Sequence, residues 1–161
     1  TSDPANIVYA REVQQMVDDL NLADHIHWTG FVDNPAVSAH LTAADLIALP
    51  FRDGVSLRRG SLMAALAHGC TIITTQPEVS TEDLRGDVHV RLIPPDSPTS
   101  LALAIEDLAD NPALCRSMGE NARELAAQFA WDRIAARTGA FFAELIAKKR
   151  CAGREDSTSE S

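Results

Sequence analysis

The residues best suited to chemistry lie in a loop rich in glycine, serine and arginine, at positions 53–61. This loop follows the apolar run 46–50 and precedes a segment of small residues that ends at Gly69. The order predicts strand, loop and helix, with the loop at the carboxyl edge of a parallel sheet, where such folds bind ligands. Free backbone N–H groups at a helix start, beside arginine side chains, suit phosphate oxygens. The alternative is an ordinary loop whose arginines are only solvated.

Composition limits the partners that the chain can have. The 161 residues carry a net charge of −9, which argues against nucleic acid or an anionic membrane as the main partner. An anion site must therefore be a local patch, and Arg52, Arg58 and Arg59 form such a patch close to a loop. We expect no partnership with nucleic acid.

Cysteine content and hydropathy indicate where the protein works. The three cysteines are odd in number and unevenly spaced, so we expect neither a metal site nor a disulfide framework, and a reducing compartment fits better. No apolar stretch approaches the roughly 20 residues that span a bilayer, and no signal peptide opens the sequence. We therefore expect a soluble, cytoplasmic protein.

The elements that must position the loop alternate between strands and helices, which indicates an α/β fold with a parallel sheet. Strands are expected at residues 25–28, 46–49, 71–75 and 89–93. Helices are expected to begin at Pro4, Asn34 and Leu57. A helical C-terminal tailpiece follows, with starts at Ser97-Pro98, Asn111-Pro112 and Trp131, the first two being a capping residue followed by proline. One domain is predicted over 1–150, and 151–161 is expected to be a disordered tail.

The order of short motifs resembles the C-terminal half of group 1 glycosyltransferases of the GT-B fold. Each motif is weak alone, but together they follow the family order from about residue 5 to about residue 145. The matching segments are His27–Val32, Ala43–Pro50, Asp53-Gly54, Ala64–Gly69, Ile72–Thr75, Leu92–Asp96, Leu101–Ile105, Asp110–Pro112, Met118–Arg123 and Phe129–Trp131.

The resemblance implies a Rossmann-like domain that binds a nucleotide-sugar donor. In the family, the loop after the third strand lies against the nucleobase, and here that loop is Gly30, Phe31 and Val32. A glycine permits close approach of the backbone, and Phe31 offers an apolar face. The alternative for Phe31 is simple packing in the core at a strand end.

The family carries two glutamates separated by seven residues, one near the donor sugar or phosphate and one near the ribose. Asp53-Gly54 stands for the first Glu-Gly and makes Asp53 the candidate catalytic residue. Counted from Asp53, the second glutamate falls on Ser61, and counted from Gly69 it falls on Ala64. In its place stand arginine, glycine and serine residues, which implies an insertion or a reworked helix start.

This replacement suits an anion site that needs no metal. The guanidinium groups of Arg58 and Arg59 can grip a diphosphate, Gly60 permits close approach, and Ser61 can bond a phosphate or ribose oxygen. Phosphate held in this way makes the nucleoside diphosphate a better leaving group. No Asp-x-Asp triad of the metal-using type occurs in the sequence, and no cofactor beyond the donor substrate is expected. The alternative is a copy that has lost donor chemistry and serves as a binding or assembly module.

The resemblance also implies that parts of the family's machinery lie outside this sequence. Two strands of the donor-binding half and the N-terminal acceptor domain have no counterpart here. We expect a fragment, inactive alone, that is completed by an N-terminal domain in cis or by a second chain. The expected activity is transfer of a hexosyl group to an unknown acceptor, with retention as the commoner mode of the family. A sugar-nucleotide epimerase would need a pair of carboxylates for proton transfer, and none occurs at a suitable spacing.

Overall fold

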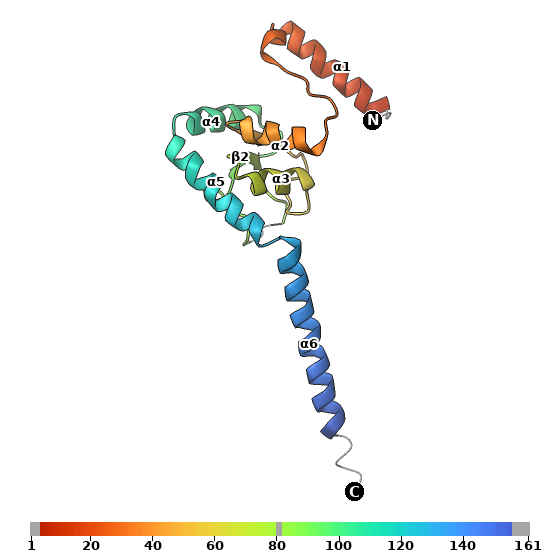
Figure 1. The fold of residues 1–161 in the computed structure, drawn as a ribbon. Coiled ribbons are helices and arrows are strands. Elements are labelled where there is room, and N and C mark those ends of the chain that lie inside the picture. The colour runs from red at the N-terminus through yellow and green to blue at the C-terminus, as the bar shows by residue number, and fades with distance from the viewer. Residues whose placement is uncertain (1–3, 80–81, 156–161) are drawn as a thin grey trace. The chain divides into compact units, whose positions relative to one another are not determined.

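The computed structural model of the protein describes residues 4–79 and 82–155 (Figure 1). The chain divides into two compact units, Thr1–Val37 and Ser38–Ser161, each held together by its own contacts. The boundary between the units falls within the second α-helix, and the single domain over residues 1–150 stays a prediction.

The first unit contains α1 (Pro4–Asp19), the short 3-10 helix η1 (Ala23–His25) and the start of α2 (Asn34–Ala43). The carboxylate of Asp33 accepts a hydrogen bond from the backbone N–H of Ala36 at 3.0 Å, which caps the first turn of α2. Both helix starts predicted for this part of the sequence are confirmed.

The strand predicted at residues 25–28 is wrong. His25 ends η1, and residues 26–30 form neither helix nor strand. A strand is stable only when neighbouring strands satisfy its N–H and C=O groups, and the described residues of this unit contain no such neighbour.

The sheet of the second unit has three parallel strands in the order β1 (Ile47–Leu49), β2 (Ile72–Thr75) and β3 (Arg91–Ile93). The three strands predicted for this part of the sequence are confirmed, each one or two residues shorter than expected. All four side chains of β2 are buried, because strands pair with it on both sides and helices cover both faces.

Four helices belong to the second unit alone, and they are α3 (Gly60–His68), α4 (Pro98–Ala109), α5 (Pro112–Ala127) and α6 (Trp131–Glu155). The side chains of Ser97 and Asn111 cap α4 and α5, accepting hydrogen bonds from the third N–H that follows each of them, at 3.3 and 3.4 Å. The predicted starts of α4, α5 and α6 are confirmed. Helix α3 begins three residues later than predicted, since residues 57 and 58 form a turn.

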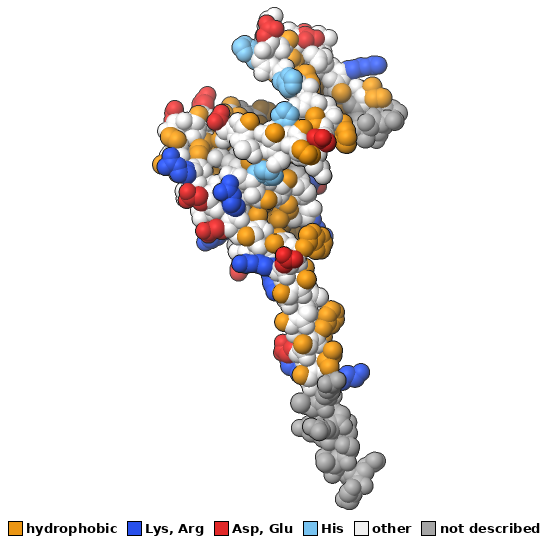
Figure 2. All heavy atoms as spheres, in the orientation of Figure 1, with side chains coloured by type: hydrophobic (Ala, Val, Ile, Leu, Met, Phe, Trp, Pro, Cys, Tyr) orange, Lys and Arg blue, Asp and Glu red, His pale blue; other side chains and the backbone are white. Residues whose placement is uncertain are grey.

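Most of the large apolar side chains described for helix α6 are exposed to solvent. Figure 2 shows hydrophobic side chains along this helix, and the exposed ones are Trp131, Ile134, Phe141, Phe142, Leu145 and Ile146. The helix continues to Glu155, so it enters the segment 151–161 that was predicted to be a disordered tail, and 156–161 lie outside the described residues. Among the described residues, no helix is both long enough and apolar enough to cross a membrane.

The core of the second unit is divided by the sheet, because neighbouring residues of a strand point to opposite faces. On one face, Ile72 shares a cluster with Leu66 of α3 and Leu125 of α5. On the other face, Ile73 shares a cluster with Leu108 of α4. Helix α3 therefore packs on one face of the sheet and α4 on the other, while α5 contributes residues to both clusters.

Helices α3 and α5 meet at a pair of glycines. Gly69 ends α3 with a left-handed backbone (φ +68°), and its carbonyl oxygen would overlap with a Cβ atom placed at Gly119 of α5. Only a residue without a side chain lets the two helices approach this closely. This glycine pair therefore sets how closely the end of α3 approaches α5.

We predict that Gly119→Ala lowers the free energy of unfolding by about 1–3 kcal/mol, because the added methyl group overpacks the contact with Gly69. The matched control is Gly139→Ala in α6, where a Cβ atom would meet nothing within 4 Å. The control should be neutral or up to about 1 kcal/mol more stable, since alanine favours helix more than glycine does. Urea unfolding followed by circular dichroism measures both, and equal effects would contradict the account of the helix contact.

Candidate functional site

The candidate site lies where the three strands of the second unit end. Because the strands are parallel, the loops that follow β1, β2 and β3 emerge at the same edge of the sheet. The loop after β1 holds the predicted residues from Asp53 to Arg59 and leads directly into α3, which begins with the predicted residues Gly60 and Ser61. An exposed ion pair between Arg52 and Asp96, at 3.1 Å, links this loop to the loop after β3.

The turn at Gly54 packs the loop after β1 against the loop after β2. Gly54 is buried and has a left-handed backbone (φ +78°). A Cβ atom there would lie 2.7 Å from the carbonyl oxygen of Gln76 and 2.9 Å from the backbone nitrogen of Glu78. The buried hydroxyl of Thr75 also donates a hydrogen bond to the carbonyl of Phe51 at 2.7 Å. The structure thus requires glycine at position 54 for packing and backbone conformation, independently of any ligand.

Arg59 is held inside the site by two neighbours. Its Nη2 atom forms an ion pair with the carboxylate of Asp53, and its guanidinium carbon lies 4.0 Å from the centre of the Phe51 ring. Its Nε atom is buried and has no hydrogen-bond partner within the described residues. This side chain, only 29% exposed, is therefore committed to protein contacts on two sides.

The ion pair fixes the charge of Asp53. The hydrogen bond from Arg59 lowers the pKa of the Asp53 carboxyl from its ordinary value of 3.8, and the positive charge of Arg59 acts in the same direction. The pair therefore supports the fold above the ordinary pKa and is lost as the pH falls through the lowered one. At neutral pH Asp53 is an ionised hydrogen-bond acceptor and a weak base.

Arg58 has a different environment from Arg59. Its side chain is exposed and makes no hydrogen bond or ion pair with any described residue, while its backbone N–H donates to the hydroxyl of Ser56 at 3.3 Å. Of the two guanidinium groups predicted to bind a diphosphate, that of Arg58 is thus free of other described residues and that of Arg59 is already paired with Asp53.

The start of α3 is open. Arg59 occupies the capping position with an extended backbone, and no side chain caps the helix. Gly60 and Ser61 follow as the first helical residues and are exposed, and the first turn contains no acidic residue. Unsatisfied N–H groups at a helix start favour anions.

Gly60 has no structural reason to be glycine. Its φ angle lies in the ordinary range, and a Cβ atom at this position would meet nothing within 4 Å among the described residues. Position 60 thus contrasts with position 54, where packing alone excludes a side chain. Open space above a glycine at a bare helix start allows an oxygen-bearing group to approach the backbone closely.

The predicted nucleobase loop, residues 30–32, belongs to the first unit, whereas residues 53–61 belong to the second. Gly30 has a left-handed backbone (φ +60°), and a Cβ atom there would meet no described residue within 4 Å. Phe31 is fully exposed and Val32 is half-buried. Core packing of Phe31 within its own unit, the alternative considered from the sequence, is therefore wrong. A contact with a nucleobase remains a prediction.

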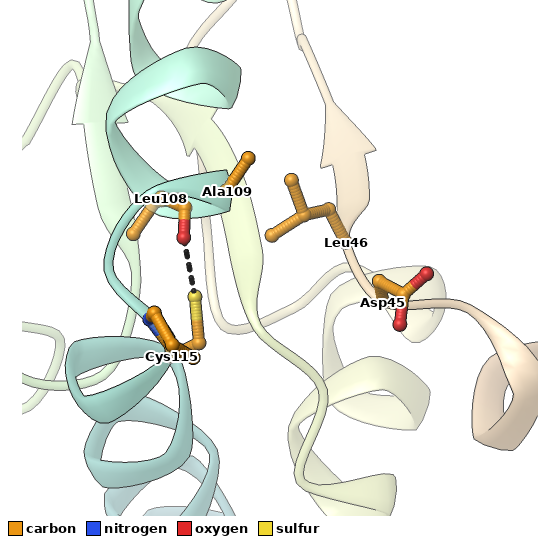
Figure 3. Close-up of a pocket in the computed structure, with 6 residues that line it drawn as sticks. Asp45, Leu46, Leu108, Ala109 and Cys115 are labelled. Carbon is orange, nitrogen blue, oxygen red and sulfur yellow. Dashed lines mark hydrogen bonds between the residues drawn. The ribbon is translucent and has the colours of Figure 1, made fainter.

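A cavity of about 350 Å³ lies elsewhere in the second unit (Figure 3). It is found where β1 begins and α4 gives way to α5, and it is lined by Asp45, Leu46, Leu108, Ala109, Pro112 and Cys115. The thiol of Cys115 donates a hydrogen bond to the carbonyl of Leu108 at 3.1 Å. The cavity contains none of the predicted site residues.

Sequence reasoning missed the role of Phe51. The ring lies under the guanidinium of Arg59, eight positions later in the chain, through a loop without regular structure. No periodic pattern connects such positions. The only signal in the sequence was an aromatic residue at the end of an apolar strand, which is also typical of core packing.

One comparison with known proteins shows the family of the chain. The sequence pattern described as "Glycosyl transferases group 1" matches residues 8–125. An MMP alpha-(1->4)-mannosyltransferase of Mycolicibacterium hassiacum is 28% identical over 138 residues, which cover 84% of this chain and 33% of that protein.

Two solved structures show the same likeness in three dimensions. Sucrose-phosphate synthase from Thermosynechococcus elongatus has a TM-score of 0.72 and 25% identity, covering 88% of this chain and 35% of that one. Anabaena HepE, solved in complex with UDP, has a TM-score of 0.72 at 19% identity, covering 91% of this chain and 38% of that one, and this likeness concerns the fold alone. The chain spans about a third of the length of these relatives.

We predict that the two neighbouring arginines differ in their effect on stability. Arg59→Ala should lower the free energy of unfolding by about 1 kcal/mol, because the contact with Phe51 is lost. Arg58→Ala should stay within about 0.5 kcal/mol of the wild type, since the exposed side chain has no partner among the described residues. Thermal unfolding of both variants measures the difference, and a larger loss for Arg58→Ala would contradict the observed arrangement.

Proposed function

The chain belongs to the group 1 glycosyl transferases, and from this premise we propose that it forms the donor-binding part of an enzyme that transfers a sugar from a nucleoside diphosphate sugar to an acceptor. Two relatives support this proposal. One is named as a mannosyltransferase, and another, similar in fold, was solved in complex with UDP. The donor's diphosphate binds at the start of α3.

The observation that carries the proposal is the exposed glycine at position 60. Neither packing nor backbone conformation requires glycine there, and the N–H groups of the first turn of α3 have no side-chain cap. A diphosphate oxygen that approaches the backbone at Gly60 receives hydrogen bonds from these N–H groups. A methyl group at the same position would stand in its way.

Arg58 and Ser61 complete the proposed phosphate site. The guanidinium of Arg58 is free to form charge-assisted hydrogen bonds with phosphate oxygens, and the exposed hydroxyl of Ser61 adds a further donor. Negative charge develops on the nucleoside diphosphate as it leaves the sugar. Positive groups fixed in place before the reaction stabilise that charge and lower the barrier.

The remaining parts of the reaction follow from the same proposal. Gly30, Phe31 and Val32 bind the nucleobase, and Asp53 lies beside the transferred sugar. Arg58 and the helix start supply the positive charge that a metal ion supplies in other transferases, so transfer is metal-independent. The transferred group is a hexosyl group and its configuration is retained. The acceptor and its binding domain come from outside this chain, in cis or on a second polypeptide.

Isothermal titration with UDP, GDP and ADP, and with their sugar conjugates, tests the proposal. The wild type should bind at least one of them, and Gly60→Ala should bind it at least tenfold more weakly, because the methyl group blocks the approach of phosphate. The stability of Gly60→Ala should be equal to that of the wild type or up to about 1 kcal/mol higher, since alanine restricts the unfolded chain. Gly139→Ala is the matched control and should bind like the wild type.

Two results would overturn the proposed donor site. Unchanged affinity of a folded Gly60→Ala variant would show that phosphate does not approach the start of α3. Failure of every nucleotide to bind the folded wild type would favour the alternative, a binding or assembly module without donor chemistry. The family's second glutamate falls on Ser61 or on Ala64, depending on the register, and the absence of a carboxylate at either position favours that alternative.

A further inference from the structure

We infer that Phe51 and Arg59 are positioning residues, which hold the carboxylate of Asp53 in place as an acceptor for the hydroxyl groups of the donor's sugar. This inference rests on the proposed function for the identity of the ligand. It assigns different roles to neighbouring arginines, since Arg58 grips the diphosphate and Arg59 does not.

The geometry commits Arg59 to this role. The guanidinium carbon of Arg59 lies over the Phe51 ring, 4.0 Å from its centre, its Nη2 atom bonds Asp53, and its Nε atom is buried without a partner among the described residues. A ring beneath a planar guanidinium restricts its tilt and therefore the direction in which Nη2 points. That direction sets the position of the Asp53 carboxylate.

Phe51 is itself fixed by the sheet. It lies two residues after β1, its side chain packs against the buried cluster that includes Val55 and Leu66, and its carbonyl accepts the hydrogen bond from Thr75. A chain of contacts therefore runs from the central strand through Phe51 and Arg59 to Asp53. Three-quarters of the Asp53 side chain remains exposed at the end of that chain, where a ligand can reach it.

The pairing also resolves a conflict of charge. An unpaired carboxylate in the loop that leads to the phosphate site would repel a diphosphate. Arg59 neutralises Asp53 without removing its capacity to accept hydrogen bonds, because an ionised carboxylate has about four acceptor sites and Nη2 uses one of them. The remaining sites fit sugar hydroxyl groups, which donate.

The first test needs no ligand and follows the carboxyl carbon of Asp53 by NMR during a pH titration. In the wild type its pKa should lie below 3.8, because Arg59 is the only other side chain of the described residues that shifts it. Phe51→Leu keeps an apolar side chain but removes the ring, so the pKa should rise toward 3.8 as Arg59 loses its fixed direction. Phe51→Tyr keeps the ring and should restore the wild-type value.

Arg52→Ala is the control for this titration. It breaks a neighbouring exposed ion pair, with Asp96, and should leave the pKa of Asp53 unchanged. An unchanged pKa of Asp53 in folded Phe51→Leu would overturn the inference. So would an equal shift in Phe51→Leu and Phe51→Tyr, which would show that the ring is not what positions the guanidinium.

The second test separates the sugar from the phosphate. Affinities for UDP and UDP-glucose, and for GDP and GDP-mannose, are compared in the wild type and in Phe51→Leu. In Phe51→Leu, the ratio of the affinity for the nucleotide sugar to the affinity for the bare nucleotide should fall by about three- to tenfold, which corresponds to the loss of one hydrogen bond. The affinity for the bare nucleotide itself should stay within twofold of the wild type. An equal loss for nucleotide and nucleotide sugar would overturn the inference. If no nucleotide binds the wild type, the proposed function fails, and the carboxyl titration still decides whether Phe51 and Arg59 position Asp53.

Discussion

The close packing of the Gly54 turn on the loop after β2 is the constraint on which the candidate site depends. The left-handed backbone of Gly54 leaves no room for a side chain between the two loops. The hydroxyl of Thr75 fixes the start of the same loop through the carbonyl of Phe51. Because Phe51 and Gly54 are both held against β2 and the loop that follows it, the chain from Phe51 to Arg59 has a defined course. This course places Gly60 at the start of α3.

A chain with a net charge of −9 can bind an anion only where positive groups outweigh the negative ones locally. The start of α3 in the second unit has this local balance of charge. The first turn of α3 has no acidic residue, and the nearby Asp53 is balanced by Arg59. Arg58 is then left as a free positive group beside the open N–H groups of the helix start. Net charge argues against polyanions as the main partner, but it carries no information about this arrangement.

Local signals made much of the fold predictable. Capping residues followed by proline predicted the starts of α4 and α5, and short apolar runs predicted the three strands of the sheet, because each signal lies within the element that it specifies. The strand predicted at 25–28 failed because pairing depends on residues far away in the chain. In the site, residue types predicted the loop. They could not distinguish Arg58 from Arg59, because that distinction depends on the Phe51 ring and on the direction of each side chain.

The most direct measurement of the central claim follows the backbone amides by ¹⁵N NMR while inorganic pyrophosphate is added, a probe that carries neither base nor sugar. If the start of α3 is the diphosphate site, the amide signals of Gly60, Ser61 and Leu62 shift most, and they shift together with a single binding curve. The shifts should weaken with added salt, as expected for an exposed anion site. If these three amides do not move while others elsewhere in the second unit do, the diphosphate binds at another place and the account of the site is wrong.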